Sequence, residues 1–136
     1  MNIVAQELKY FASKLDILLV DDDERLRIEL KRMLQIFFKS VTVASDGSEA
    51  FEVYTTKSFD LVITDIDMPN MNGIELSQKI KSFNGNQAII ILSGFIESYL
   101  SELNDMKIDS LLLKPFTLNK FMEILRKESE ILFLEK

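Results

Sequence analysis

The chain of 136 residues contains no cysteine and no histidine. The missing cysteine excludes a disulfide framework and thiol chemistry, which is consistent with a reducing compartment. Without histidine there is no imidazole base and no histidine metal ligand, so acid–base chemistry must use carboxylates, lysine or groups of the substrate. The four glycines do not form a glycine-rich phosphate loop, so nucleotide binding of that kind is not expected.

Long apolar runs are also missing, and none approaches the length that a membrane span needs. The N-terminal residues mix acidic and polar side chains with apolar ones, unlike the continuous apolar core of a signal peptide. We therefore expect a cytoplasmic protein without a membrane segment. The net charge is −6 and the pI is about 4.7. A surface this acidic repels phosphate backbones, so direct binding of nucleic acid is not expected.

The chain does contain four short aliphatic runs, each of which ends at a polar or charged group. They are Ile17–Val20 before Asp21, Leu61–Thr64 before Asp65, Ile89–Leu92 before Ser93, and Leu111–Leu113 before Lys114. Such runs predict strands that are buried on both faces of a parallel sheet. Because ligands of these sheets bind at the carboxyl ends of the strands, we expect the polar groups to meet at one edge.

Strand and helix patterns alternate along the chain, which is typical of βαβ units. Strands are expected near 16–20, 40–44, 60–64, 88–92 and 110–113, and helices near 23–38, 48–56, after Gly73, near 96–105 and after an N-cap at Thr117. One chain of this length with 47% hydrophobic residues fits a single domain. The predicted fold is α/β, a doubly wound five-stranded parallel sheet with helices on both faces, for which the order 2-1-3-4-5 is typical.

Both ends carry additional apolar patterns. Residues 1–14 form one predicted helical extension, residues 15–128 the domain, and residues 129–136 a second helical extension. Two interpretations stay open: the ends pack onto the domain as extra helix, or they form a homodimer contact or lead to a partner.

The aspartates after the first and third runs, Asp21, Asp22 and Asp65, should share one cleft. Three carboxylates in one cleft repel one another, and burial further disfavours their charged form. A hard divalent cation removes this problem, and Mg²⁺ prefers few carboxylates, several waters and a phosphate oxygen. The cluster therefore predicts a Mg²⁺ site that receives a phosphoryl group, although Asp21–Asp23 alone equally fits a turn and helix N-cap.

Asp65 stands alone at the end of its strand, where a carboxylate can attack phosphorus and form an aspartyl phosphate. Phosphoryl transfer needs mainly positioning and charge neutralisation. Mg²⁺ would supply one counter-charge and the Lys114 ammonium the second, and the Ser93 hydroxyl would donate to another phosphoryl oxygen. Singly, Ser93 and Lys114 are more typical of a turn and an exposed side chain; together, at three strand ends, they favour a phosphoryl site.

Four motifs in order resemble the receiver domain of two-component response regulators, a family with a flavodoxin-like fold that includes chemotaxis regulators. They are Val20–Asp23, Thr64–Pro69 with Gly73, Leu92–Gly94 and Leu113–Phe116, and the resemblance covers about residues 15–128. It implies that Asp65 is the phospho-acceptor and that Ser93 and Lys114 bind the phosphoryl group. It also implies a cis Lys114–Pro115 bond, against a base rate of about 5–6% for such bonds.

For the metal, the resemblance implies that Asp22 binds Mg²⁺ directly, that Asp21 acts mostly through water, and that Asp67 offers its backbone carbonyl. A histidine kinase or a histidine phosphotransfer protein would donate the phosphoryl group, and the chain would not be an enzyme. Ser93 would then move toward the phosphoryl group, and the face made of the fourth helix, fifth strand and fifth helix of the domain would bind a downstream target or effector domain. This mechanism is a population shift.

One position departs from the family pattern. The usual aromatic residue lies three positions before the lysine, where this chain has Leu111. Leucine has no ring to reorient and no hydroxyl to expose, so Phe95 or Tyr99 could carry the readout instead, unless both only pack or lie at the surface. The resemblance also places Phe95 and Asp67 beside the path of the water that hydrolyses the acyl phosphate.

Two other functions compete with this one. Asp65 and Asp67 also resemble the nucleophile and acid pair of haloacid-dehalogenase-type phosphatases, but that family places the pair on its first strand and needs further acids downstream. A third hypothesis is a receiver-like module that binds partners without being phosphorylated. The presence of all four residues Asp22, Asp65, Ser93 and Lys114 argues against it. No effector domain is evident, so we expect either a stand-alone receiver or the N-terminal part of a longer regulator.

Overall fold

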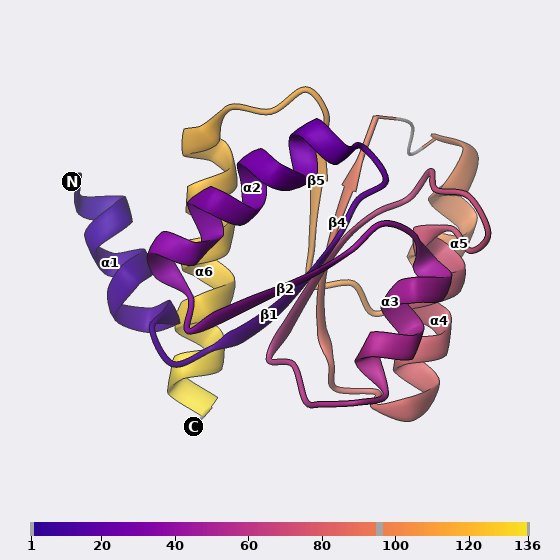
Figure 1. Ribbon diagram of the computed structural model, residues 1–136, viewed down its shortest axis with the longest axis horizontal. Coiled ribbons are helices and arrows are strands. Elements are labelled where there is room, and N and C mark those ends of the chain that lie inside the picture. Colours follow the sequence, from indigo (N-terminus) through magenta and orange to yellow (C-terminus); the bar gives the residue numbers. More distant parts are fainter. Residues whose placement is uncertain (1, 95–96, 136) are drawn as a thin grey trace.

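The structure is a computed structural model that describes residues 2–94 and 97–135. Its five strands form one parallel sheet in the order β2-β1-β3-β4-β5. The strands are β1 (Asp16–Val20), β2 (Ser40–Ala44), β3 (Leu61–Asp65), β4 (Ala88–Ser93) and β5 (Ser110–Leu113). The predicted fold class and strand order are confirmed (Figure 1).

Helices cover both faces of the sheet (Figure 1). One face carries α1 (Ile3–Ala12), α2 (Glu24–Phe37) and α6 (Leu118–Glu135), and the other carries α3 (Gly47–Tyr54), α4 (Gly73–Phe83) and α5 (Leu100–Asp105). The single helix expected near 96–105 is instead a 3₁₀ turn, η1 (Glu97–Tyr99), followed by α5. The break occurs at Tyr99, whose φ of −121° and ψ of 7° lie outside the α-helical region.

The three central strands are buried on both faces, as their aliphatic runs predict. Every residue of β3 and β4 is buried, and so is β1 apart from Asp16. For β5 the prediction is wrong, because Leu111 and Leu113 are 38% and 52% exposed. This strand lies at the edge of the sheet, and the short α5 beside it has no buried residue to cover that face.

Several helices begin where short polar side chains satisfy their first backbone N–H groups. The carboxylate of Asp23 accepts from the Leu26 amide at the start of α2. Asn72 and Glu75 form a reciprocal capping box at the start of α4. The predicted N-cap at Thr117 is also present, since its hydroxyl accepts from the Lys120 amide.

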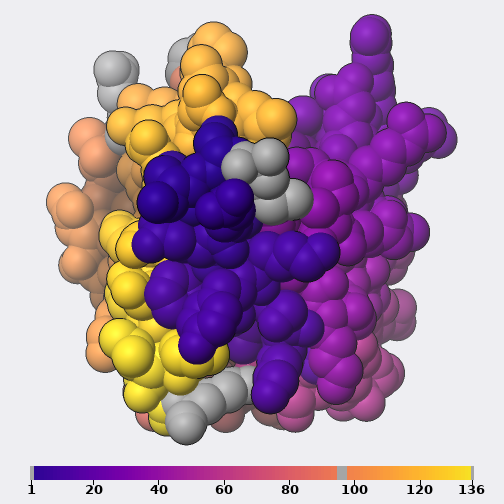
Figure 2. All heavy atoms as spheres, turned by 90° about the vertical axis from the view of Figure 1, so that its left-hand side faces the viewer, coloured from indigo at the N-terminus to yellow at the C-terminus, as the bar shows by residue number. Residues whose placement is uncertain are grey.

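The terminal helices pack against each other on one side of the domain. Figure 2 shows α1, in indigo, next to the C-terminal part of α6, in yellow. Leu8 of α1 is fully buried there, the Phe11 and Phe133 rings lie 5.3 Å apart, and Arg126 forms an ion pair with Glu7 at 3.1 Å. Residues 129–135 continue α6 without interruption. These contacts correspond to the first interpretation of the chain ends, in which they pack onto the domain as extra helix.

None of the helices in the described part of the chain is both long enough and apolar enough to cross a membrane.

We expect that α1 contributes to the stability of the domain and is not a loosely attached arm. Leu8→Ala should lower the free energy of unfolding by about 2–5 kcal/mol, because it leaves a cavity among fully buried side chains. Ile3→Ala is the matched control in the same helix: Ile3 is 70% exposed, so its loss should cost less than about 0.5 kcal/mol. Urea denaturation measures both, and equal small effects would show that α1 packs weakly.

Candidate functional site

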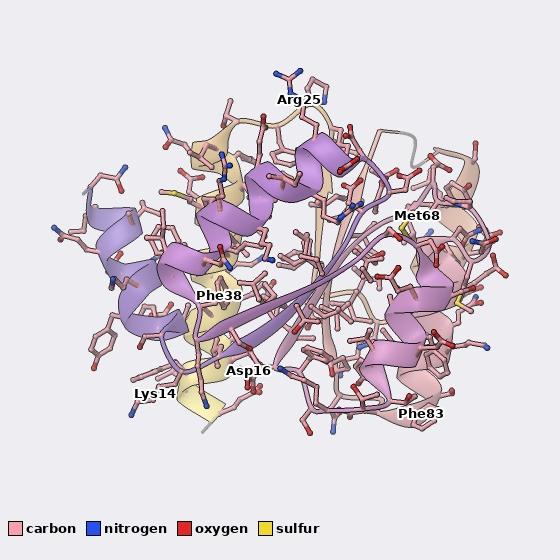
Figure 3. All side chains as sticks on the ribbon, in the orientation of Figure 1. Lys14, Asp16, Arg25, Phe38, Met68 and Phe83 are labelled. Atoms are coloured by element: carbon pink, nitrogen blue, oxygen red, sulfur yellow. The ribbon has the colours of Figure 1, made fainter. Side chains whose placement is uncertain are left out.

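The four sequence motifs meet at the carboxyl edge of the sheet. Asp65 and Ser93 are the last residues of β3 and β4, while Asp21 and Lys114 directly follow β1 and β5. The strands are parallel and in register, with Asp65 opposite Leu92 and Ser93 opposite Leu113. Figure 3 marks the two opposite edges of the sheet. Asp16, at the start of β1, lies low in the view, and Met68, after the carboxyl end of β3, lies higher and to the right.

Three aspartates converge at this edge. Single carboxylate oxygens of Asp21, Asp22 and Asp65 all lie within 4.8 Å of one another. Asp21 is fully buried and Asp65 is 7% exposed, whereas Asp22 faces solvent. The convergence predicted from the strand ends is therefore present, with two of the three carboxyl groups removed from water.

The triplet Asp21–Asp23 divides between two roles. Asp23 is the N-cap of α2, which matches the alternative interpretation of a turn and cap. Asp21 instead points inward, where its Oδ1 accepts from the Asp23 amide at 2.9 Å. The Arg27 guanidinium donates to the Asp21 backbone carbonyl at 2.8 Å. Sequence reasoning missed Arg27, because no motif connects a residue on the first turns of α2 with a carbonyl before the helix.

The backbone around Asp65 is held tightly. Its Oδ1 accepts from the Ile66 amide at 2.9 Å, and its carbonyl accepts from the Thr64 hydroxyl at 2.8 Å. Gly73, the first residue of α4, donates to the Ile66 carbonyl at 2.8 Å. A Cβ at Gly73 would lie 2.0 Å from the Asp65 carbonyl oxygen, so only glycine allows α4 to approach the strand end this closely.

Lys114 joins the carboxylates from the far side of the site. Its ammonium lies 3.3 Å from Asp21 Oδ2 and 3.4 Å from Asp65 Oδ2. The backbone amide of Lys114 donates to the Ser93 carbonyl at 2.8 Å, which fixes the lysine beside the end of β4. The Lys114–Pro115 peptide bond is cis, as the motif predicts.

The other predicted site residues occupy less central positions. Ser93 is fully buried at the end of β4. Asp67 is exposed, and its carboxylate accepts a hydrogen bond from the Tyr99 hydroxyl at 2.9 Å. Phe95 lies outside the described residues. Sequence reasoning singled out Asp67 and Tyr99 separately, but it had no signal for a contact between residues so far apart in the chain.

Burial changes the acid–base properties of the site. Desolvation raises the pKa of Asp65 to about 6; the Lys114 ammonium opposes this shift and the Asp21 carboxylate adds to it. For Lys114, burial by itself disfavours the charged form, but the Asp21 and Asp65 carboxylates outweigh it and raise the pKa. Lys114 therefore stays cationic, yet its single charge does not fully compensate the buried acids.

The side chains present fit a hard divalent cation. Carboxylate oxygens are the ligands that Mg²⁺ accepts, and two ligands of one Mg²⁺ ion lie at most about 4.2 Å apart, since each bond is about 2.1 Å. The three carboxylate oxygens of the cluster lie within 4.8 Å of one another. This spacing fits one Mg²⁺ ion if the carboxylate farthest from the ion contacts it through a water molecule. A cation here would also supply the positive charge that Lys114 alone lacks.

Comparison with known protein families gives a match to the response regulator receiver domain over residues 17–126. Among curated proteins, the sensor protein EvgS of Escherichia coli is 36% identical over 107 residues, which are 78% of this chain and 9% of EvgS. The response regulator MprA of Mycolicibacterium vanbaalenii is 32% identical over 112 residues, which are 81% of this chain and 48% of MprA. The chain thus spans between about a tenth and a half of these two relatives.

Solved structures agree with this match. The N-terminal domain of an uncharacterised Wolinella succinogenes protein superposes with a TM-score of 0.83 at 30% identity, covering 90% of this chain and 99% of that one. The response regulator TrrA of Thermotoga maritima, crystallised in complex with Mg²⁺ and BeF, has a TM-score of 0.74 at 31% identity and covers 84% of this chain and 98% of its own.

The raised pKa of Asp65 predicts a pH dependence of stability. Between about pH 4 and pH 6 the folded protein retains a proton that the unfolded chain releases, so this group's contribution to stability falls as the pH rises through that window. Asp65→Asn removes the cost of the buried charge. In buffer with a chelator, the variant should gain stability over wild type by about 1–3 kcal/mol at neutral pH, and this gain should vanish near pH 4.

Urea denaturation of both proteins across the pH range measures the difference. A gain that is the same at every pH, or that grows toward acid, would contradict the prediction.

Proposed function

Because the chain belongs to the response regulator receiver domain family, we propose that Asp65 is its phospho-acceptor and that a histidine kinase or histidine phosphotransfer protein is the donor. Domains of this family are phosphoryl-accepting signalling modules that interact with histidine kinases and downstream effectors. The observation that carries the assignment is the Lys114 ammonium, at 3.3 Å from Asp21 and 3.4 Å from Asp65. This ammonium lies within ion-pairing distance of both the proposed nucleophile and a second, buried carboxylate, which supports the assignment.

In the proposed reaction, a carboxylate oxygen of Asp65 attacks the phosphorus of a phosphohistidine. The new oxygen–phosphorus bond forms as the phosphorus–nitrogen bond breaks, and the histidine nitrogen takes the electron pair and is protonated. The nucleophile must be ionised. The pKa of about 6 keeps most Asp65 ionised at neutral pH, and the bond from the Ile66 amide orients the carboxylate.

When bound, Mg²⁺ would neutralise charge on the carboxylates and the phosphoryl oxygens. We assign the direct contact to Asp22, a water-mediated contact to Asp21, and a backbone carbonyl contact to Asp67, with Asp65 as a further ligand. The exposure of Asp22 and the full burial of Asp21 support this division.

Lys114 and Ser93 are proposed to bind the phosphoryl group. The Lys114 ammonium would exchange part of its ion pair with Asp65 for a phosphoryl oxygen, because transfer consumes the negative charge of the free carboxylate. Ser93 stands at the end of the strand next to β3, which supports a role for its hydroxyl as donor to a second oxygen.

We propose that phosphorylation is signalled through the face formed by α5, β5 and α6, the fourth helix, fifth strand and fifth helix of the domain without α1. This face exposes the apolar side chains Leu100, Leu111, Leu113 and Leu118. An exposed apolar patch of this kind is suited to a protein target.

The phosphatase alternative loses support from the geometry. A phosphatase of that type would use Asp67 as the acid that protonates the leaving group. Instead, the Asp67 carboxylate is exposed and already accepts a hydrogen bond from the Tyr99 hydroxyl. We infer that the chain accepts a phosphoryl group without turning over phosphate monoesters.

A homodimer through the terminal helices stays a prediction. Leu8 and Ala12 are already buried within the monomer, and the exposed apolar side chains that could form such a contact are Ile3 and Tyr10 of α1 and Ile131, Phe133 and Leu134 of α6.

Incubation with acetyl phosphate and Mg²⁺, followed by intact-mass measurement, tests the phospho-acceptor. Wild type should gain the mass of one phosphoryl group, and Asp65→Asn should gain none. Asp60→Asn is the matched control, since it changes a carboxyl group just before β3, at the opposite edge of the sheet. Modification of Asp65→Asn to the wild-type level would disprove the assignment, as would loss of modification in Asp60→Asn.

The absence of a ring at position 111 gives a second prediction. Leu111→Tyr should leave the rate of phosphorylation within about twofold of wild type, because residue 111 lies on β5 outside the acidic cluster. The same variant should change how the α5–β5–α6 face responds to phosphorylation, measured as backbone amide shifts by NMR. A collapse of the phosphorylation rate would refute this separation of chemistry from output.

A further inference from the structure

A single hydrogen bond joins the loop after the acceptor strand to the segment before α5. Asp67 lies two residues after Asp65, and Tyr99 is the last residue of η1 and the N-cap residue of α5. The Tyr99 hydroxyl donates to Asp67 Oδ1 at 2.9 Å. This bond spans 32 positions of the sequence and connects the edge of the acceptor site with one border of the proposed output face.

The helix that follows Tyr99 is weakly attached to the domain. α5 has six residues, none of them buried, and no side-chain hydrogen bond caps its N-terminus. Its attachment comes from half-buried apolar side chains that pack on the core under α3 and α4, namely Tyr99, Leu103, Met106 and Ile108. Tyr99 is therefore unusual in this segment, because it combines a ring contact with a hydrogen bond to a charged acceptor.

The neighbouring strand β5 has no aromatic ring at the corresponding position. The position three before Lys114 is Leu111, which is 38% exposed and cannot form a hydrogen bond. The space between α5 and β5, about 250 Å³, is lined by the apolar side chains of Leu100, Leu103, Ile108 and Leu111 and by the polar residues Asn104, Asp109 and Ser110. The Tyr99 hydroxyl hydrogen-bonds to the loop after the acceptor strand, whereas the Ser110 hydroxyl of β5 donates to Glu128 of α6. Of these two polar groups, Tyr99 therefore offers the route from the acceptor site to this face.

We propose that the Tyr99–Asp67 hydrogen bond is a latch that holds α5 in its unphosphorylated position and that weakens when Asp65 is loaded with cation and phosphoryl group. The proposal rests on the assigned role of Asp65. A divalent cation near residues 65–67 attracts the Asp67 carboxylate and reduces its strength as a hydrogen-bond acceptor. The latch therefore costs less to open in the loaded state, and α5 is released toward a second arrangement.

Thermodynamic linkage makes the coupling reciprocal. If loading the site weakens the latch, then removing the latch must favour loading by the same factor. A protein without the Tyr99 hydroxyl should bind Mg²⁺ and a phosphoryl mimic more tightly, although Tyr99 touches neither of them. A residue that only packs against the core would not change this affinity.

The test compares Tyr99→Phe with wild type by NMR, titrating first Mg²⁺ and then beryllofluoride as the phosphoryl mimic. Tyr99→Phe keeps the ring and removes the hydroxyl. We expect its apparent affinity for beryllofluoride with Mg²⁺ to rise about three- to tenfold, in keeping with the loss of one hydrogen bond to a charged group. Before any addition, the amide shifts of β5 and α6 should already be displaced toward their loaded positions.

Tyr54→Phe is the matched control. The Tyr54 hydroxyl also donates to a side chain, Gln87 Oε1 at 2.7 Å, but it lies at the opposite edge of the sheet. This variant should bind like wild type. Introducing Tyr99→Phe into an Asp67→Ala background completes a double-mutant cycle, in which the effect of the tyrosine change should disappear because its partner is gone.

An unchanged or lowered affinity in Tyr99→Phe would overturn the latch, as would an equal effect in Tyr54→Phe or an effect that persists in the Asp67→Ala background. The proposed function fails separately: if wild type neither binds beryllofluoride nor gains a phosphoryl group, the assignment of Asp65 is wrong. If wild type does both and the Tyr99 variant behaves identically, the latch alone is wrong.

Discussion

An imbalance of charge at the carboxyl edge of the sheet governs the site. Two buried carboxyl groups, Asp21 and Asp65, share one ammonium, and a third carboxylate lies within reach of both. Lys114 attracts Asp65, yet the pKa of Asp65 still stands near 6, because burial and the Asp21 charge outweigh the lysine. In the folded protein, the ionised form of Asp65 is thus destabilised by burial and by the neighbouring Asp21 charge; this electrostatic strain is a property of the fold itself. A bound cation would relieve that strain, and the proposed transfer of a phosphoryl group to Asp65 would move the charge outward to oxygens that Lys114 can reach.

Sheet topology produces this crowding and no local motif could do so alone. In the order β2-β1-β3-β4-β5, the strands that end at Asp21 and Asp65 are direct neighbours although β2 lies between them in the sequence. The crossover helices α2 and α4 then start beside the two strand ends. Gly73 shows how little room is left, since any side chain there would collide with the Asp65 carbonyl. The same tight packing removes the acids from water and fixes their direction.

The sequence was most informative where the order of apolar and polar residues within a short segment determines the local structure. Aliphatic runs predicted β1, β3 and β4 correctly, and the aspartates after β1 and β3, together with the lysine after β5, predicted the acidic cluster with Lys114. The same rule also located β5 correctly, but the burial it predicts on both faces of that strand was wrong, because exposure of Leu111 and Leu113 depends on how far a neighbouring helix extends and not on the strand itself. The split of Asp21–Asp23 into a buried acid and a helix cap could not be read from three identical residues. Contacts such as Tyr99 with Asp67 or Arg126 with Glu7 depend on tertiary structure and leave no local trace.

Stabilising contacts are distributed unevenly between the two halves of the domain. The acceptor half has fully buried strands, a capping box on α4 and an N-cap on α2. By contrast, α5 has no buried residue, and β5 is a half-exposed edge strand. Segments with few buried contacts open at low free-energy cost, and a two-state element must have a gap of only a few kcal/mol if one ligand is to shift it. A rigid acceptor beside a loosely held helix meets that requirement, because the free energy of binding at Asp65 would then be spent on the proposed rearrangement of α5 and not on unfolding the site itself.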